Sequence, residues 1–143
     1  LTGPTVDDAT LTLRICELLG MVPTWEWRPD GPAYTATETA IFYGAIAATP
    51  DAAIGVRVYG ALDDSPRHVY GRRAQLRFRG RKNQRDAADR MAGTAFAVLD
   101  GLPRVGGISG IRRFSFGPSV TDDNGREERT DNYSIILDNP EAS

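Results

Sequence analysis

The clearest pattern of apolar and polar positions lies in residues 68–80. Ala74, Leu76 and Phe78 occupy alternate positions, so a strand would turn their side chains to the same face. The positions between and beside them are polar: Arg73, Gln75, Arg77 and Arg79. This two-residue period predicts an antiparallel strand with one face buried and the other in solvent.

Two earlier segments also favour extended structure. Residues 53–59 (AIGVRVY) alternate aliphatic side chains with Gly, Arg and Tyr, which predicts a second half-buried strand. Residues 39–47 (TAIFYGAIA) look extended, and the sequence Thr-Pro-Asp at 49–51 ends them.

The last forty residues combine two strand-like runs around a polar turn. The runs are residues 110–120 and 126–137, and the turn between them, residues 121–125, reads TDDNG. Gly125 can adopt the positive φ that a hairpin turn requires. The second run opens with the charged sequence REER and then alternates apolar with polar residues. We therefore predict a β-hairpin with about half of its surface exposed.

Two amphipathic helices are predicted from apolar residues at every third or fourth position. The first spans residues 6–19, after a start at Thr5 and Asp8 that resembles a capping box. The second follows Asn83, the expected N-cap, and contains Gly93, which would let the helix approach a sheet closely.

Together these elements predict one α+β domain over residues 1–143. Its sheet is mostly antiparallel with about five strands, and two helices pack on one face. A chain of 143 residues with 41% hydrophobic residues is long enough to bury a single core. Two long connections, residues 20–38 and 60–67, exceed what a minimal domain needs, and such loops often bind partners.

Charge is unevenly distributed along the chain, although the net charge is only −2. Residues 1–64 hold three basic and nine acidic groups, a net charge of −6. Residues 67–90 carry +7 and residues 91–143 carry −3. Opposite charges on different surfaces favour docking between copies of one chain.

The sequence predicts no catalytic, cofactor-binding or metal-binding residue, so we do not expect an enzyme. His68 is the only histidine and Cys16 the only cysteine, too few for a zinc site without a carboxylate cluster. The neighbours of Cys16 are apolar, which predicts a buried thiol. No apolar run of the length of a membrane helix occurs, and no membrane partner is expected.

One alternative function stays open, a small α+β nucleic-acid-binding module that uses the arginine-rich strand. Arg73, Arg77 and Arg79 would share one strand face and could neutralise phosphates. RNA-binding sheets also expose aromatic side chains that stack on bases, whereas Phe78 is predicted on the opposite face. A basic face that meets protein or solvent is the favoured interpretation.

Three blocks, in order along the chain, resemble the tail terminator or minor capsid proteins of siphophages, in particular those of phages that infect actinobacteria. They are residues 37–64 (TETAIFYGAIAATPDAAIGVRVYGALDD), 79–102 (RGRKNQRDAADRMAGTAFAVLDGL) and 124–137 (NGREERTDNYSIIL). The family pattern closes with a segment of the form R.ERSDNY, in which this chain has Thr130 where serine is frequent.

This resemblance implies a structural virion protein. Such a tail terminator forms a hexameric ring, ends polymerisation of the tail tube and joins the tail to the head or neck connector. The implied partners are copies of the chain itself, the tail tube protein, the connector and stopper proteins, and genomic DNA that passes through the lumen without sequence-specific binding. The implied location is the tail and neck of the virion, after assembly in the host cytoplasm, and no cofactor is implied.

Charged side chains on the predicted strand faces are the candidates for contacts with other subunits or with the tube. Charge is concentrated there without an evident local partner, and unpaired charge on a strand face is available to a neighbouring protein. The candidate interface residues are Arg73, Arg77, Arg79, Arg126, Glu127, Glu128, Arg129, Asp131 and Tyr133.

Overall fold

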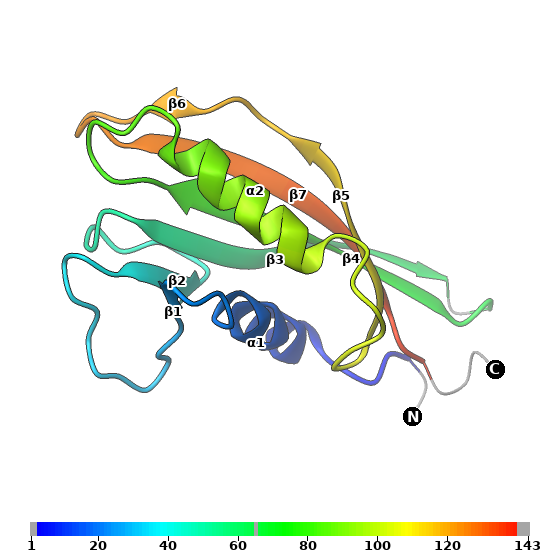
Figure 1. The fold of residues 1–143 in the computed structure, drawn as a ribbon. Coiled ribbons are helices and arrows are strands. Elements are labelled where there is room, and N and C mark those ends of the chain that lie inside the picture. The colour runs from blue at the N-terminus through cyan, green and yellow to red at the C-terminus, as the bar shows by residue number, and fades with distance from the viewer. Residues whose placement is uncertain (1–2, 65, 140–143) are drawn as a thin grey trace.

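A computed structural model describes residues 3–64 and 66–139 and places two helices against one curled sheet (Figure 1). The predicted α+β class is confirmed. The helices are α1 (Asp8–Leu19) and α2 (Ala87–Leu99), and no helix in the described ranges is long and apolar enough to cross a membrane. The strands are β1 (Trp25–Glu26), β2 (Thr39–Tyr43), β3 (Ala53–Asp64), β4 (Val69–Arg79), β5 (Ile108–Phe116), β6 (Val120–Thr121) and β7 (Glu127–Leu137).

The sheet is larger than predicted and mixed rather than mostly antiparallel. Its strand order is β1-β2-β3-β4-β7-β5, and β6 pairs with part of β7. β1, β2 and β3 run parallel to one another, whereas every other pair is antiparallel. β1 has only two residues and β2 five, so neither carries enough alternation to reveal how it pairs.

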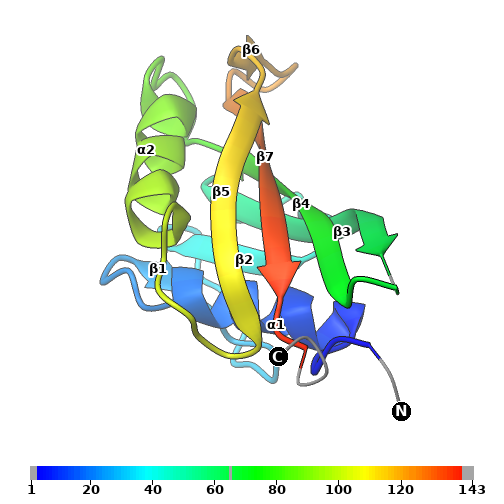
Figure 2. The same cartoon turned by 90° about the vertical axis from the view of Figure 1, so that its right-hand side faces the viewer.

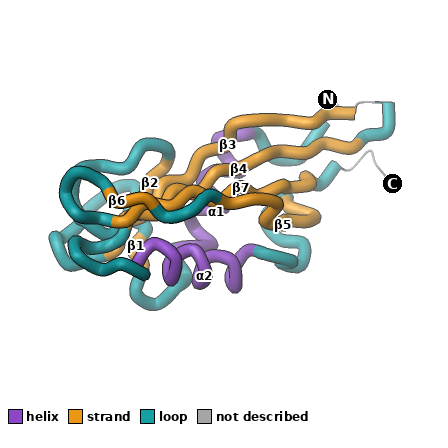
Figure 3. The backbone as a smooth tube through the Cα atoms, turned by 90° about the horizontal axis from the view of Figure 1, so that it is seen from above, coloured by secondary structure: helices purple, strands orange, loops and turns teal. Residues whose placement is uncertain are grey.

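Both helices pack on the same face of the sheet, as predicted (Figures 2 and 3). Helix α1 lies against β2 and β3, and α2 lies against β4 and β7. Ion pairs from the same sheet face reach both helices: Arg72 of β4 pairs with Asp8 of α1, and Arg129 of β7 pairs with Asp89 of α2. The opposite face of the sheet has no helix on it within the described part of the chain.

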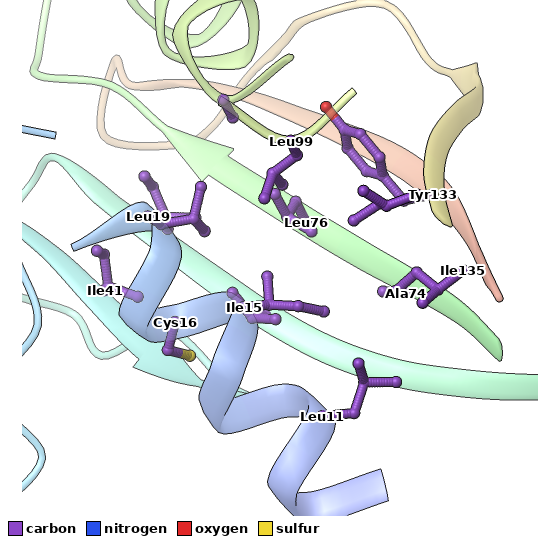
Figure 4. Packing of buried hydrophobic residues seen from close by; sticks show 14 of the residues in the cluster. Leu11, Ile15, Cys16, Leu19, Ile41, Ala74, Leu76, Leu99, Tyr133 and Ile135 are labelled. Atoms are coloured by element: carbon purple, nitrogen blue, oxygen red, sulfur yellow. The ribbon is translucent and has the colours of Figure 1, made fainter. Parts of the chain in front are cut away.

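One hydrophobic core fills the space between the helices and the sheet (Figure 4). Burying each large aliphatic or aromatic side chain there contributes about 1.5–3 kcal/mol. The period of two predicted within residues 68–80 is confirmed, because Ala74, Leu76 and Phe78 all enter this core. The fully buried side chains include Leu11, Ile15 and Leu19 of α1, Ala74, Leu76 and Phe78 of β4, Leu99 of α2, and Tyr133 and Ile135 of β7.

The helix starts differ from the predicted capping residues. Asp7, not Thr5, is the N-cap of α1: its Oδ1 accepts a hydrogen bond from the backbone N–H of Thr10 at 2.7 Å, which lowers the pKa of the Asp7 carboxyl. Asn83 lies in a turn with φ +60, and α2 begins after Asp86, which makes no side-chain cap hydrogen bond. The presence of the two helices and the end of the first at Gly20 were correctly predicted, whereas the N-caps were not.

The C-terminal hairpin is confirmed. β5 and β7 pair antiparallel, and Gly125 adopts φ +76 in the turn between β6 and β7. The β3–β4 hairpin, in contrast, is longer than predicted, because β3 continues through residues 60–64 where a loop was expected. A β-bulge between Val58 and Gly60 shifts the register there, so the apolar alternation stops although the strand does not.

The start of α2 approaches the sheet tightly at Gly80, directly after β4. A Cβ added to Gly80 would lie 2.3 Å from the Cβ of Ala87, at the start of α2. Gly93, the glycine predicted to allow this approach, is exposed, and an added Cβ would meet nothing within 4 Å. The prediction for Gly93 is therefore wrong, because that position points away from the sheet.

The two glycines make a matched pair for a stability test. Gly80→Ala should lower the free energy of unfolding by about 1–3 kcal/mol, because the extra methyl group overpacks the junction of β4 and α2. Gly93→Ala should raise it by about 0.5–1 kcal/mol, since alanine is the better helix former at an exposed position. Urea unfolding followed by circular dichroism measures both, and equal effects would contradict the assigned packing.

Candidate assembly surfaces

The sheet face opposite the helices presents a regular set of polar side chains, which we call the helix-free face. These side chains alternate along each strand with residues of the core, so they point away from it. Cross-strand register aligns them in rows across β3, β4, β7 and β5. The helix-free face comprises Arg57, Arg73, Gln75, Arg77, Arg112, Ser115, Thr130, Asn132 and Ser134.

Positive charge dominates this face. Arg57, Arg73 and Arg112 are exposed, and none of them forms an ion pair with any residue that the structure describes. Arg77 is also exposed and pairs with Glu128, its Nη2 lying 2.9 Å from Oε1. The helix-free face therefore keeps three arginines without a carboxylate partner among the described residues.

One end of the helix-free face is closed by the loop that connects β2 to β3. We call this loop, residues 44–52, the loop strap. Gly55 of β3 lies beneath it, and a Cβ added there would come 2.6 Å from the carbonyl oxygen of Gly44. Only glycine leaves room for so close a crossing of backbone over strand.

Arg79 holds the loop strap to the sheet. Arg79 is only 5% exposed, and its guanidinium donates hydrogen bonds to four backbone carbonyl oxygens: Ala47 at 2.7 Å, Pro50 at 2.8 Å, Asp51 at 2.8 Å and Ala48 at 3.4 Å. The expectation that Arg79 lies on an exposed strand face is wrong. Strand alternation turns it to the predicted face, but the loop strap covers that end of the face.

Arg126, the residue directly before β7, also contacts the loop strap. It is buried, its Nε donates to Oδ2 of Asp122 at 2.8 Å, and its Nη1 donates to the carbonyl oxygen of Ala48 at 3.0 Å. Burial, together with the nearby Arg126 charge, lowers the pKa of Arg79. Arg126 also had been expected on an exposed face, and its local partners explain why it is not.

Two more candidate interface residues lie on the helix side of the sheet. Asp131 is fully buried between Arg129, whose Nε donates to Oδ1 at 2.8 Å, and Arg113, whose Nη1 donates to Oδ2 at 3.3 Å. Tyr133 is fully buried in the core, which raises the pKa of its hydroxyl. Neither side chain is exposed, because positions 131 and 133 share the core-facing period of β7.

The remaining candidates keep some exposure. Arg73 and Arg77 are exposed on the helix-free face, whereas Glu127, Glu128 and Arg129 are half-buried and have partners within the chain. A role of these five residues in contacts with other subunits stays a prediction.

An exposed apolar cluster on the β3–β4 hairpin and the neighbouring end of β7 was not predicted from the sequence. Leu62, Val69 and Ile136 lie on the helix-free side around Gly71 and are 76%, 45% and 44% exposed. We call these three residues the arm cluster. The run of three apolar residues at 135–137 carried a signal for it, because in a strand they cannot all point into the core.

The residues considered for chemistry are dispersed. Cys16 lies in the core, where burial raises the pKa of its thiol to about 12. His68 lies in the turn between β3 and β4 with φ +55. Within the described ranges, no group of three or more His, Cys, Asp or Glu side chains is placed to hold a metal ion.

The chain has a clear match among protein families. The sequence model of one family, described as bacteriophage tail terminator protein, matches residues 24–139. The match includes every strand and α2, whereas α1 lies outside it. No curated protein matches the chain.

The loop strap gives a direct test of the role of Arg79. Arg79→Ala should lower the free energy of unfolding by about 2–4 kcal/mol, because it leaves three carbonyl oxygens without their donor. Arg77→Ala, two positions along the same strand, should cost less than about 1 kcal/mol, since its ion pair is exposed. Chemical denaturation measures both; a similar loss for the two variants would mean that the strap does not depend on Arg79.

Cys16 provides a probe of the intact core. With its pKa raised to about 12, the thiol stays protonated and shielded at about pH 8, so a thiol-specific reagent should not label it in the folded protein. In concentrated urea the same reagent should label one thiol per chain. Rapid labelling without denaturant would show that α1 does not hold Cys16 in the core.

Proposed function

Because this chain belongs to the bacteriophage tail terminator protein family, we propose that it closes the head-proximal end of the phage tail as a ring of identical subunits. The match over residues 24–139 is the observation that carries this proposal. It also confirms the resemblance to a tail terminator family that the three sequence blocks indicated. The chain is thus a structural protein of the phage tail.

In the proposed role, six copies form the ring. The ring stops the addition of tail tube subunits on one side and meets the connector or stopper proteins of the head on the other, and genomic DNA passes through its lumen. Assembly takes place in the host cytoplasm and the finished ring resides in the virion. A closed ring requires two different surfaces on each subunit that fit each other, and the helix side and the helix-free side of this fold differ in chemistry.

We assign protein contacts to the arm cluster. Single exposed apolar side chains are ordinary, but two on the projecting β3–β4 hairpin with a third beside them on β7 leave apolar area that a partner would bury. Residues 57–64 of β3 also have an edge next to this cluster that no described strand pairs with, because β2 pairs only with residues 53–56. A second chain could pair with that edge while it covers the arm cluster.

The sequence-predicted interface residues enter this proposal in two ways. Exposed Arg73 and Arg77 face a partner in the virion, and Glu128 borders the same face through its pair with Arg77, whereas Glu127 and Arg129 lie on the helix side of β7. Arg79, Arg126, Asp131 and Tyr133 act from within the fold, since they position the loop strap and β7.

Polymerisation of the cognate tail tube protein in the presence of this chain tests the proposed function. Negative-stain images should show tubes of limited length with the chain at one end, and native mass spectrometry should detect hexamers, either free or released from tubes. Tubes that grow equally long with and without the chain would contradict a terminator role.

The same assay tests the arm cluster. Leu62→Ser with Val69→Ser should weaken capping at least about tenfold, because two aliphatic side chains no longer gain from burial. Met21→Ser with Val120→Ser is the matched control, since both residues are also exposed and apolar but lie outside the β3–β4 hairpin. Equal capping by both double variants would remove the arm cluster from the interface.

A further inference from the structure

Three exposed arginines of the helix-free face make no ion pair with a described residue. They are Arg57 of β3, Arg73 of β4 and Arg112 of β5. Arg73 only stacks on the ring of Phe114, its Cζ lying 4.9 Å from the ring centroid. Unlike Arg79 and Arg129, these side chains are free to meet a ligand.

The sheet register spreads them evenly over the face. Arg73 and Arg112 stand in one row with Ser134 between them, which places their backbones about 10 Å apart. Arg57 stands in the next row, opposite Gln75, about 7 Å along the strands. The positive charges are thus separated rather than clustered, and they span four strands.

The side chains that share rows with these arginines are uncharged and polar, and one aromatic ring, that of Phe114, stacks on Arg73. The intervening positions on β4, β7 and β5 are Gln75, Asn132, Ser134 and Ser115. Arg, Ser, Asn and Gln are residue types that contact phosphate and sugar oxygens in protein–DNA complexes. The cores of protein–protein interfaces are depleted of charged residues, whereas the rows that hold these arginines are largely polar.

We propose that the helix-free face binds the phosphate backbone of double-stranded DNA. The inference rests on the proposed function, in which DNA passes through a ring of these chains. Within the described residues no helix lies on this face that could enter a groove, the loop strap is held against one end of the sheet by Arg79, and the exposed ring of Phe114 already stacks with Arg73. The contact therefore does not read base sequence.

Charge determines how strong the binding is. The whole chain has a net charge of −2, so a single subunit binds DNA weakly and only at low ionic strength. In a ring, the same three arginines recur in every subunit and act on one duplex together, which raises the overall affinity.

The test compares two triple variants of the full chain that remove the same charge. Arg57→Gln, Arg73→Gln and Arg112→Gln together remove the three arginines of the helix-free face that have no ion-pair partner among the described residues. Arg67→Gln, Arg85→Gln and Arg104→Gln together remove three exposed arginines elsewhere. Fluorescence anisotropy with a labelled duplex of mixed sequence, measured over a series of low salt concentrations, gives the affinity and its salt dependence.

The first variant should bind at least about tenfold more weakly than the unaltered chain, with a salt slope smaller by about 2–3, because about 0.9 is lost for each phosphate contact. The second should keep the slope. Equal losses in both variants, or no binding of the duplex by rings of the unaltered chain, would overturn the inference.

The tube-capping assay separates this inference from the proposed function. A first triple variant that still caps tubes but has lost DNA binding supports the inference. If that variant loses capping while its unfolding curve is unchanged, the face contacts protein and the DNA assignment is wrong. If the unaltered chain does not cap tubes, the proposed function fails, whatever the DNA measurement gives.

Discussion

Burial of only one face of the sheet is the constraint on which the rest of this structure depends. α1 and α2 supply the apolar surface that covers the inner face, and their packing accounts for the single core. The helix-free face is not covered by any described helix, so its side chains must either be polar and solvated or be buried by a partner. Its three regions differ accordingly: the loop strap covers one end, arginines and amides occupy the centre, and the arm cluster lies toward the hairpin.

Local signals in the sequence were enough to predict much of this fold. The period of two in residues 68–80, the apolar spacing of both helices and the turn at Gly125 depend on residues close in sequence. The parallel pairing of β1 and β2 could not be predicted in this way, because it depends on packing between short segments. The bulge near Tyr59 hid the end of β3 for a related reason, since it breaks the period without ending the strand.

The candidate interface was predicted less well, because burial of a charged side chain depends on distant partners. Arg79 finds its carbonyl acceptors about thirty positions earlier in the chain, in the loop strap. Asp131 finds Arg113 across the hairpin. A run of charges such as REER therefore looks uniform in sequence, although strand alternation sends Arg126 and Arg129 to opposite faces, each to its own acceptor. Such partners are determined by the tertiary structure and produce no periodic pattern in the sequence.

Ion pairs within the fold also determine how much of the charge of each segment is available to a partner. Part of the excess positive charge in residues 67–90 is balanced by carboxylates from other segments: Arg72 pairs with Asp8 and Asp63, and Arg77 pairs with Glu128. Arg73 has no such partner among the described residues, and the sheet brings it together on one face with Arg57 and Arg112 from other segments, so this set cannot be read from segment totals. Separated arginines among neutral amides bind each phosphate weakly, so contacts can break and re-form one at a time. On the proposed function, a lumen that must let DNA pass needs contacts of this kind rather than a few strong ones.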